Sequence, residues 1–125
     1  MKHIAILLAF LMTLSAPVAA QDFQKGLAAA QTGDYATALQ EWTPLAEAGD
    51  PDAQSNLGVM YKQGKGVLQD NVMAHMWYNI ANANGTELGG KARERIAKKM
   101  TPAAIEKAQA MARECMSSDY KKCGY

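Results

Sequence analysis

Residues 53–67 read AQSNLGVMYKQGKGV, and this stretch decides the fold. Four apolar side chains recur in it at the i, i+4, i+7 and i+8 spacing of one helix face, namely Ala53, Leu57, Met60 and Tyr61. Gly64 and Gly66 follow, and glycine tolerates the left-handed backbone angles with which many helices end. Just before the stretch, the Asp50 carboxylate can cap free N–H groups, and Pro51 suits the first helical position. The sequence therefore predicts a short amphipathic helix with a marked beginning and end.

A longer helix is predicted on either side of this one. On the N-terminal side, the apolar stripe at helical spacing consists of Tyr35, Ala38, Leu39, Trp42, Leu45 and Ala46. On the C-terminal side, the corresponding stripe consists of Ala74, Trp77, Tyr78 and Ala81. Pro44 lies inside the first of these helices, where it removes one backbone donor, so we expect a kink there rather than a helix end.

The two longer helices repeat one another at an offset of 36 residues. At this offset Asp34 aligns with Asp70, Ala38 with Ala74, Trp42 with Tyr78, Leu45 with Ala81, and Gly49 with Gly85. A period in the thirties is typical of stacked helical hairpins, because one hairpin cannot bury its apolar face alone. Alanine and methionine are plentiful and β-branched residues are scarce, which also favours helix. The sequence thus predicts an all-α, helical-hairpin repeat solenoid of about five to six helices.

Beyond Gly85 the hairpin pattern changes, and we expect an atypical C-terminal pair of capping helices. The first is predicted over residues 88–100 from apolar residues spaced by four, which are Leu88, Ala92, Ile96 and Met100. Thr101 and Pro102 then supply a cap and a first helical residue for the last helix. The apolar stripe of that helix consists of Ile105, Ala108, Ala112 and Cys115.

These residues resemble the Sel-one-like repeat, a relative of the tetratricopeptide repeat. The A-x-x-x-L-G-x-x-Y-x-x-G-x-G-V core of that family is present without gaps in residues 53–67. Residues 33–49 are similar to the second half of a preceding repeat, and residues 86–113 to the closing helices of bacterial members. The sequence departs from the family in having one complete unit and in carrying Asn82 where a second alanine is usual. The repeat signature consists of Ala53, Leu57, Gly58, Tyr61, Gly64, Gly66, Val67, Ala74, Trp77, Tyr78, Ala81 and Gly85.

The resemblance implies binding rather than catalysis. Sel-one-like repeats look like scaffolds for partner proteins, so we expect a non-catalytic interaction module or adaptor for an unidentified protein or peptide of the bacterial cell envelope. First helices line the concave face in this repeat class, which places the expected partner-binding residues on the polar side of helix 53–63. These residues are Gln54, Asn56, Met60 and Gln63.

Two alternative functions remain open. One is a periplasmic β-lactam-binding or hydrolysing protein, by resemblance to a cysteine-rich exported branch of the same family. Members of that branch look as though a disulfide staples each hairpin, and no repeat in this sequence holds such a cysteine pair. The other alternative is a structural or stress-response accessory without a fixed ligand.

Residues 1–20 have the three parts of a secretory signal peptide. Lys2 supplies the positive start, residues 4–14 form an apolar run, and residues 18–20 are the small residues expected before a cleavage site. The apolar run is shorter than the ~20 residues that span a bilayer as a helix. We therefore expect cleavage after Ala20 and a periplasmic or secreted protein. The expected organisation is a mature domain over residues 21–125, with a partial repeat over 21–49, a complete repeat over 50–85 and a C-terminal cap over 86–125.

Charge limits the range of partners. The chain holds 13 Lys and Arg against 12 Asp and Glu, so its bulk charge does not indicate a nucleic-acid binder. The charges are nevertheless polarised along the chain. Residues 21–70 contain three Lys against seven acids, whereas residues 71–125 contain nine Lys and Arg against five acids. The basic segment from Lys91 to Lys122 permits contact with an anionic membrane surface, without integration into the membrane after signal cleavage.

Few residues suit catalysis or metal binding. The chain has two histidines, His3 and His75, and no motif gives His75 a nucleophile and an orienting acid. We therefore expect no enzymatic activity and no cofactor, and we interpret His75 as a surface or inter-helix residue. Two cysteines and one remote histidine are too few ligands for a structural zinc site, so no metal is expected.

The two cysteines, Cys115 and Cys123, lie near the C-terminus of a chain that we expect in an oxidising compartment. A continuous helix would separate them by about 12 Å along its axis, which is too far for a disulfide. An intramolecular bond, the preferred interpretation, therefore requires the last helix to stop near residues 117–119, so that the following residues fold back. An intermolecular bond and two free thiols are the alternatives.

Overall fold

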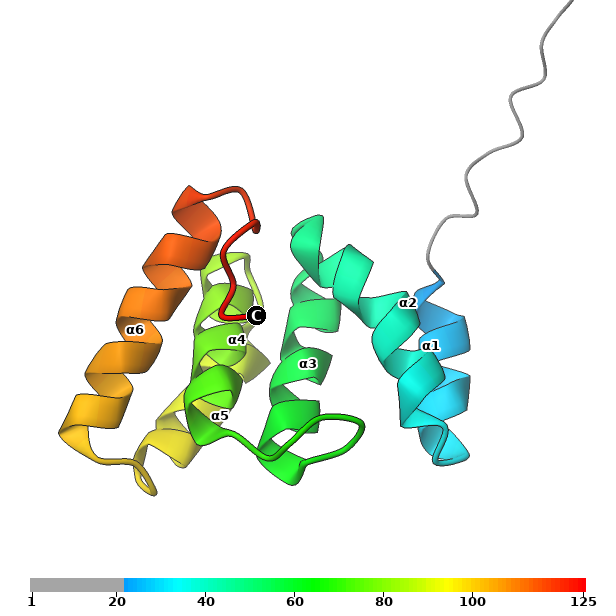
Figure 1. Cartoon of the computed structure of the whole chain (residues 1–125), viewed down its shortest axis with the longest axis horizontal. Coiled ribbons are helices and arrows are strands. Elements are labelled where there is room, and N and C mark those ends of the chain that lie inside the picture. The colour runs from blue at the N-terminus through cyan, green and yellow to red at the C-terminus, as the bar shows by residue number, and fades with distance from the viewer. Residues whose placement is uncertain (1–21) are drawn as a thin grey trace, which may run out of the picture.

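The computed structural model describes residues 22–125, and within this range the chain forms six α-helices and no β-strand (Figure 1). The predicted all-α helical-repeat fold is confirmed for these residues. The expected signal peptide over residues 1–20 lies outside the described residues. The helices are α1 (Phe23–Gln31), α2 (Tyr35–Glu47), α3 (Pro51–Gln63), α4 (Asn71–Ala83), α5 (Glu87–Ala97) and α6 (Pro102–Ser117).

Side-chain caps fix where three of the helices begin. The Asp50 carboxylate accepts a hydrogen bond from the backbone N–H of Asp52 at 2.9 Å, and Pro51 is the first residue of α3. The side chains of Asp70 and Thr101 cap α4 and α6 in the same manner, each bonding a backbone N–H three residues ahead. Such caps satisfy backbone donors that have no partner inside the helix. The beginnings of α3 and α6 confirm the sequence prediction.

Glycines with positive φ values stand at the ends of three helices, and the predicted end of α3 is confirmed. Gly64 is the C-cap of α3 with a left-handed φ of 65°. Gly49 and Gly85, with φ values of 95° and 109°, follow the caps of α2 and α4. Helix α2 continues through Pro44 to Glu47, so the proline does not end it.

The α3–α4 hairpin lies at the centre of the fold. Helix α3 packs against α2 on one side and α4 on the other, and α4 also contacts α5 and α6. Gly58 of α3 lies under the ring of Tyr78, where a Cβ atom would stand 2.5 Å from the ring carbon Cδ1. Only a residue without a side chain allows the two helices to approach this closely. The core around this contact buries Trp42, Leu57, Met60, Met73, Met76, Trp77 and Ile80.

Helix α5 packs on the core with three of its four predicted stripe residues, since Ile96 is buried and Ala92 and Met100 are partly buried beside it. Leu88, expected in its apolar stripe, is 69% exposed. Gly89 and Gly90 are buried instead, and a Cβ on Gly89 would stand 2.9 Å from the Tyr78 carbonyl oxygen. The prediction for Leu88 is therefore wrong, and the two glycines take its place at the start of the buried face. The cause is steric, because Gly89 lets α5 lie on the backbone of α4 and Gly90 leaves room for the Asn82 side chain.

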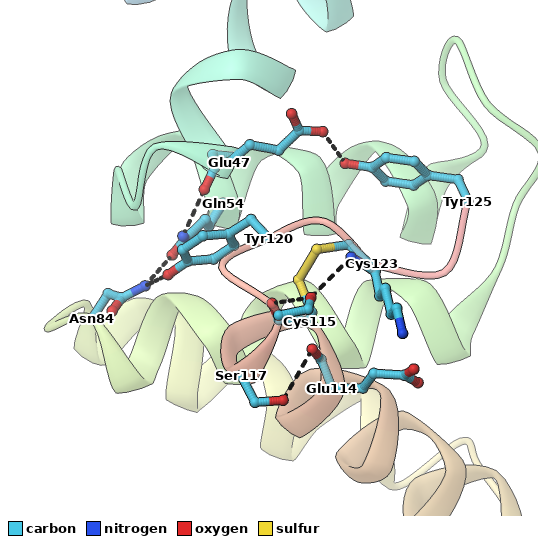
Figure 2. Close-up of a disulfide and its surroundings, with 12 residues drawn as sticks. Glu47, Gln54, Asn84, Glu114, Cys115, Ser117, Tyr120, Cys123 and Tyr125 are labelled. Atoms are coloured by element: carbon cyan, nitrogen blue, oxygen red, sulfur yellow. Dashed lines mark hydrogen bonds between the residues drawn. A yellow bond between two sulfur atoms is a disulfide. The ribbon is translucent and has the colours of Figure 1, made fainter.

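The C-terminal segment folds back and is held by a disulfide between Cys115 and Cys123 (Figure 2). Helix α6 ends at Ser117, and Asp119 and Tyr120 take left-handed φ values of 55° and 62°, which reverse the chain. The intramolecular pairing and the helix end that it requires are thus both confirmed. Closing a loop this short stabilises the fold by about 2–3 kcal/mol in the chain-entropy picture.

A chain of hydrogen bonds joins this segment to three helices (Figure 2). The Gln54 amide donates to the carbonyl oxygen of Ala46 at 2.9 Å and accepts from Asn84 at 2.9 Å. The same Asn84 nitrogen donates to the Tyr120 hydroxyl at 3.0 Å. These hydrogen bonds therefore join four parts of the chain at one end of the molecule, namely the end of α2, the start of α3, the cap of α4 and the C-terminal segment.

Candidate functional site

A groove lies between α1 and α3, with α2 beneath it. Its volume is about 210 Å³. We call it the α1–α3 groove and define it by its lining residues, which are Ala30, Gln31, Tyr35, Trp42, Asn56, Val59, Met60, Gln63 and Lys65. Aromatic and aliphatic side chains form its floor, and amides and one lysine stand around them. The groove thus combines an apolar base with neutral hydrogen-bonding groups.

Three of the four predicted partner-binding residues line this groove. Asn56, Met60 and Gln63 stand on the face of α3 that the groove exposes, with Met60 nearly buried in its floor. The prediction for Gln54 is wrong. Its side chain is fully buried, and both ends of its amide are occupied by Ala46 and Asn84. Gln54 therefore positions helices and cannot meet a partner.

Helix α1 forms one wall of the groove and packs on Trp42. The Trp42 indole N–H donates to the carbonyl oxygen of Phe23 at 3.1 Å, and the Phe23 and Trp42 rings lie 5.8 Å apart. Gly26 lets α1 approach, since a Cβ there would stand 2.5 Å from the indole nitrogen. The sequence interpretation assigned no helix to this segment. A signal was present, because the capping residue Asp22 precedes Phe23 and Leu27 at helical spacing.

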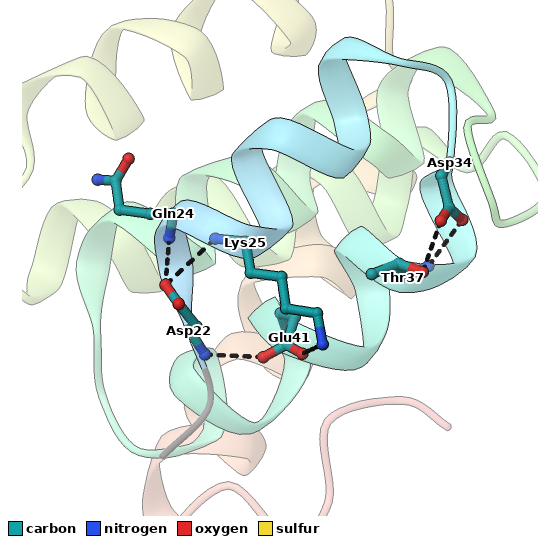
Figure 3. Close-up of polar contacts among 6 residues, drawn as sticks. All are labelled: Asp22, Gln24, Lys25, Asp34, Thr37 and Glu41. Carbon is teal, nitrogen blue, oxygen red and sulfur yellow. Dashed lines mark hydrogen bonds and ion pairs between the residues drawn. The ribbon is translucent and has the colours of Figure 1, made fainter. Parts of the chain in front are cut away.

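Polar contacts also fasten α1 to α2 (Figure 3). The Glu41 carboxylate accepts a hydrogen bond from the backbone N–H of Asp22 at 2.7 Å and forms an ion pair with Lys25 at 3.3 Å. At the start of α2, the hydroxyl and N–H of Thr37 both donate to Asp34, and these hydrogen bonds lower the pKa of the Asp34 carboxyl. The two Glu41 contacts hold the start of α1 beside α2, and the Asp34 contacts cap α2 itself.

The loop after α3 brings a positive charge to the end of the groove. The Lys65 ammonium lies 5.3 Å from the centroid of the Tyr35 ring, within the range of a cation–π contact. Gly66 lies against Tyr35 and Leu39, and a Cβ on it would stand 2.9 Å from Leu39. The loop is thus held against α2, which keeps Lys65 at the groove.

The comparison with protein families gives one match. Residues 51–86 match the Sel1 repeat, and the matched segment covers α3, the following loop and α4. This chain contains a Sel1 repeat. The match starts and ends one residue later than the complete repeat expected over residues 50–85. No curated protein and no solved structure matches the chain.

The Sel1 signature residues have structural positions that explain their identities. Seven members are buried between α3 and its neighbours, and these are Ala53, Leu57, Gly58, Ala74, Trp77, Tyr78 and Ala81. Tyr61 and Val67 are half-buried and pack at the edge of the core. Gly64, Gly66 and Gly85 all have positive φ values. The signature therefore builds the hairpin, and the groove residues Asn56, Val59 and Gln63 stand between its members.

Two further findings concern residues 22–125. They bring together no group of three His, Cys, Asp or Glu side chains suited to a metal ion. In this same range no helix combines the length and apolar character needed to cross a membrane.

His75 lies in the interior of the Sel1 repeat rather than at its surface. It is 2% exposed, and its Nδ1 atom has no hydrogen-bond partner within the described part of the chain. Burial lowers the pKa of its imidazole, and the positive charge of Arg93 lowers it further. The interpretation as an inter-helix residue fits this position, and surface exposure does not.

We predict that acidification below pH 6.5 destabilises the protein through His75. The imidazole pKa is lowered in the folded state from 6.5, so the unfolded chain binds more protons below that value. Stability is therefore full above pH 6.5 and falls as the pH decreases, by at most about 1.4 kcal/mol per pH unit. Urea unfolding followed by tryptophan fluorescence between pH 7.5 and 5.5 measures this slope. His75→Leu is expected to flatten this slope, whereas equal slopes in the parent and the variant would contradict the assignment.

Proposed function

We propose that this protein is a non-catalytic adaptor of the bacterial cell envelope that binds a peptide segment of a partner protein in the α1–α3 groove. Sel1 repeats are generally protein-interaction modules, which supports a protein partner in general terms. The observation that carries the proposal is the groove itself, where an apolar floor stands beside amides without internal partners. None of the hydrogen bonds found within residues 22–125 engages the side chains of Asn56 or Gln63.

The size of the groove favours a peptide side chain over a small-molecule ligand. Its volume of about 210 Å³ lies below the ~300–1,000 Å³ that is usual for small-molecule pockets. One or two apolar side chains fill such a space, with Trp42 and Met60 below them and Val59 at the edge. An apolar residue of the partner would thus be the anchor of the complex.

The spacing of the amides suits an extended peptide backbone. Asn56 and Gln63 are two helical turns apart on α3, which is about 10 Å along the helix axis. An extended chain covers the same distance in about three residues. Each amide can donate to a peptide carbonyl and accept from a peptide N–H, so the pair can hold backbone groups at both ends of the anchored residue. Because these contacts involve the peptide backbone, they accept partners of different sequence, as an adaptor requires.

The cell-envelope location is supported by two features. Residues 1–20 carry the pattern of a cleavable signal peptide. The disulfide between Cys115 and Cys123 belongs with an oxidising compartment such as the periplasm or the extracellular space.

A substitution in the groove tests the binding site. Val59 is 38% exposed at its edge, and Val59→Glu places a charge over the apolar floor. Peptides selected by display against the purified chain are the probes, and isothermal titration calorimetry measures their dissociation constants. We expect Val59→Glu to weaken their binding by about tenfold or more, or about 1.4 kcal/mol.

Leu88→Glu is the matched control for this experiment. It makes the same apolar-to-acid change at an exposed position of α5 that does not line the groove. Leu88→Glu should leave the dissociation constants within about twofold of the parent. Equal effects of the two substitutions, or a failure to select any peptide, would refute the groove as the binding site.

The proposed cell-envelope location is tested by identifying the first residue of the mature protein. We expect the chain produced with its native residues 1–20 in a Gram-negative host to be recovered from the periplasmic or culture fraction with Gln21 as its first residue. Intact-mass measurement before and after alkylation reports both the cleavage and the disulfide. A cytoplasmic product that begins at residue 1 or 2 would contradict the proposal.

A further inference from the structure

A second hollow lies on another side of α3, between its C-terminal turn and the C-terminal end of α5. Its volume is about 320 Å³. We call it the basic hollow and define it by its lining residues, Lys62, Arg95, Ile96, Lys98 and Lys99. Four of these five residues are cationic, and no carboxylate lines the hollow. Ile96, which is 3% exposed, forms its floor and belongs to the core beside Ala74 and Tyr78.

None of the four cations forms an ion pair within the described part of the chain. Within residues 22–125 the single ion pair joins Lys25 and Glu41, far along the chain from this hollow. Lys62 and Arg95 stand in the last turns of α3 and α5, where the helix dipole favours a positive charge. This effect explains a cation at each helix end but not the convergence of four on one concavity. A concave surface lined by one sign of charge concentrates ions of the opposite sign.

The backbone around the hollow indicates which kind of anion fits. Phosphate sites are commonly built at helix N-termini, where free N–H groups point to the oxygens. The basic hollow is formed at two helix C-termini, which present carbonyl groups instead. A peptide brings N–H donors to such carbonyls together with side-chain carboxylates for the lysines. The three lysines are separate point charges, which suits several carboxylates in series better than one compact dianion.

A lipid surface fits the hollow less well than a peptide. Peripheral membrane proteins usually combine cations with apolar side chains that enter the bilayer. The apolar residue here, Ile96, is buried in the floor of the hollow and cannot leave the core. The cations line a concavity rather than a flat face, so they meet an inserted chain more readily than a plane of headgroups.

We infer that the basic hollow is a second docking site, and that it takes an acidic peptide segment with at least two carboxylates. The site is distinct from the α1–α3 groove, since the two share no lining residue. Lys62 and Gln63 are consecutive in α3 and line different hollows, because successive helical residues point about 100° apart. One helix of the Sel1 repeat thus serves two surfaces of different chemistry, an apolar one and a cationic one.

Hexaglutamate is the probe for this site, with hexaglutamine as the uncharged control. Fluorescence anisotropy of labelled peptides at low ionic strength measures binding to the purified chain. We expect hexaglutamate to bind, hexaglutamine not to bind, and the affinity to fall as salt is added. Lys98→Gln with Lys99→Gln should weaken hexaglutamate binding by about tenfold. Lys62→Gln, on the other helix, should weaken it in the same direction.

The chain offers a control with the same change in net charge. Lys121 and Lys122 are also consecutive and exposed, and they lie in the C-terminal segment outside the hollow. Their replacement by glutamine should change the affinity by less than about threefold, because only distant charge is lost. Equal losses from the two pairs would overturn the inference, since bulk charge would then account for the binding. Circular dichroism of each variant verifies that the fold is retained.

Two further experiments test whether the hollow prefers acidic peptides to phosphate or to anionic lipid. Inorganic phosphate is exchanged for chloride at constant ionic strength, and phosphatidylglycerol vesicles are compared with phosphatidylcholine vesicles in a sedimentation assay. Displacement of hexaglutamate by millimolar phosphate would overturn the assignment in favour of a phosphate site. Binding to anionic vesicles that depends on Lys98 and Lys99, without hexaglutamate binding, would overturn it in favour of a lipid surface.

The two proposed sites are tested independently. Val59→Glu should leave hexaglutamate binding unchanged, which separates failure of this site from failure of the α1–α3 groove.

Discussion

The contact between Gly58 and the ring of Tyr78 is the constraint on which the rest of the structure depends. A Cβ atom at Gly58 would stand 2.5 Å from the ring, so the distance between α3 and α4 is set by the absence of a side chain. The backbone of Tyr78 in turn packs against α5, because Gly89 lies on the Tyr78 carbonyl oxygen. Three successive helices are therefore stacked through one tyrosine. Gly58 on α3 and Gly89 on α5 leave the space that this stacking needs.

The position of α3 within this stack explains why it borders two surfaces. Its buried face holds Leu57 and Gly58, and on either side of that face lie residues that meet solvent. Toward α1, the exposed residues lie over the apolar floor around Trp42, which gives the α1–α3 groove. Toward the end of α5, Lys62 lies near three further cations, which gives the basic hollow. The Sel1 repeat supplies the scaffold, and the residues between its signature positions supply the two chemistries.

Local features were predictable from the sequence, and features set by distant residues were not. The cap at Asp50 depends on N–H groups within three positions of it, so the start of α3 can be read directly. The burial of Gln54 depends on Asn84, thirty positions away, and a polar side chain on an amphipathic helix gives no sign of such a partner. Leu88 was wrongly assigned to the buried face of α5 because Gly89 and Gly90, which have no side chain to give an apolar pattern, pack there instead. Three groove residues were predicted from α3 alone, and the opposite wall was missed because α1 is only nine residues long and its pattern spans few turns.

The most direct test of this account is a double-mutant cycle between Gly58 and Tyr78, with unfolding free energies measured in urea. In an unconstrained helix Gly→Ala stabilises by about 1 kcal/mol. In this protein we predict that Gly58→Ala instead destabilises by about 1–3 kcal/mol, because the tyrosine ring must move. In a Tyr78→Leu background the same substitution should cost less or stabilise, which gives a coupling of about 1 kcal/mol or more. If Gly58→Ala has the same effect in both backgrounds, the close approach of α3 and α4 does not depend on this contact, and the account is wrong.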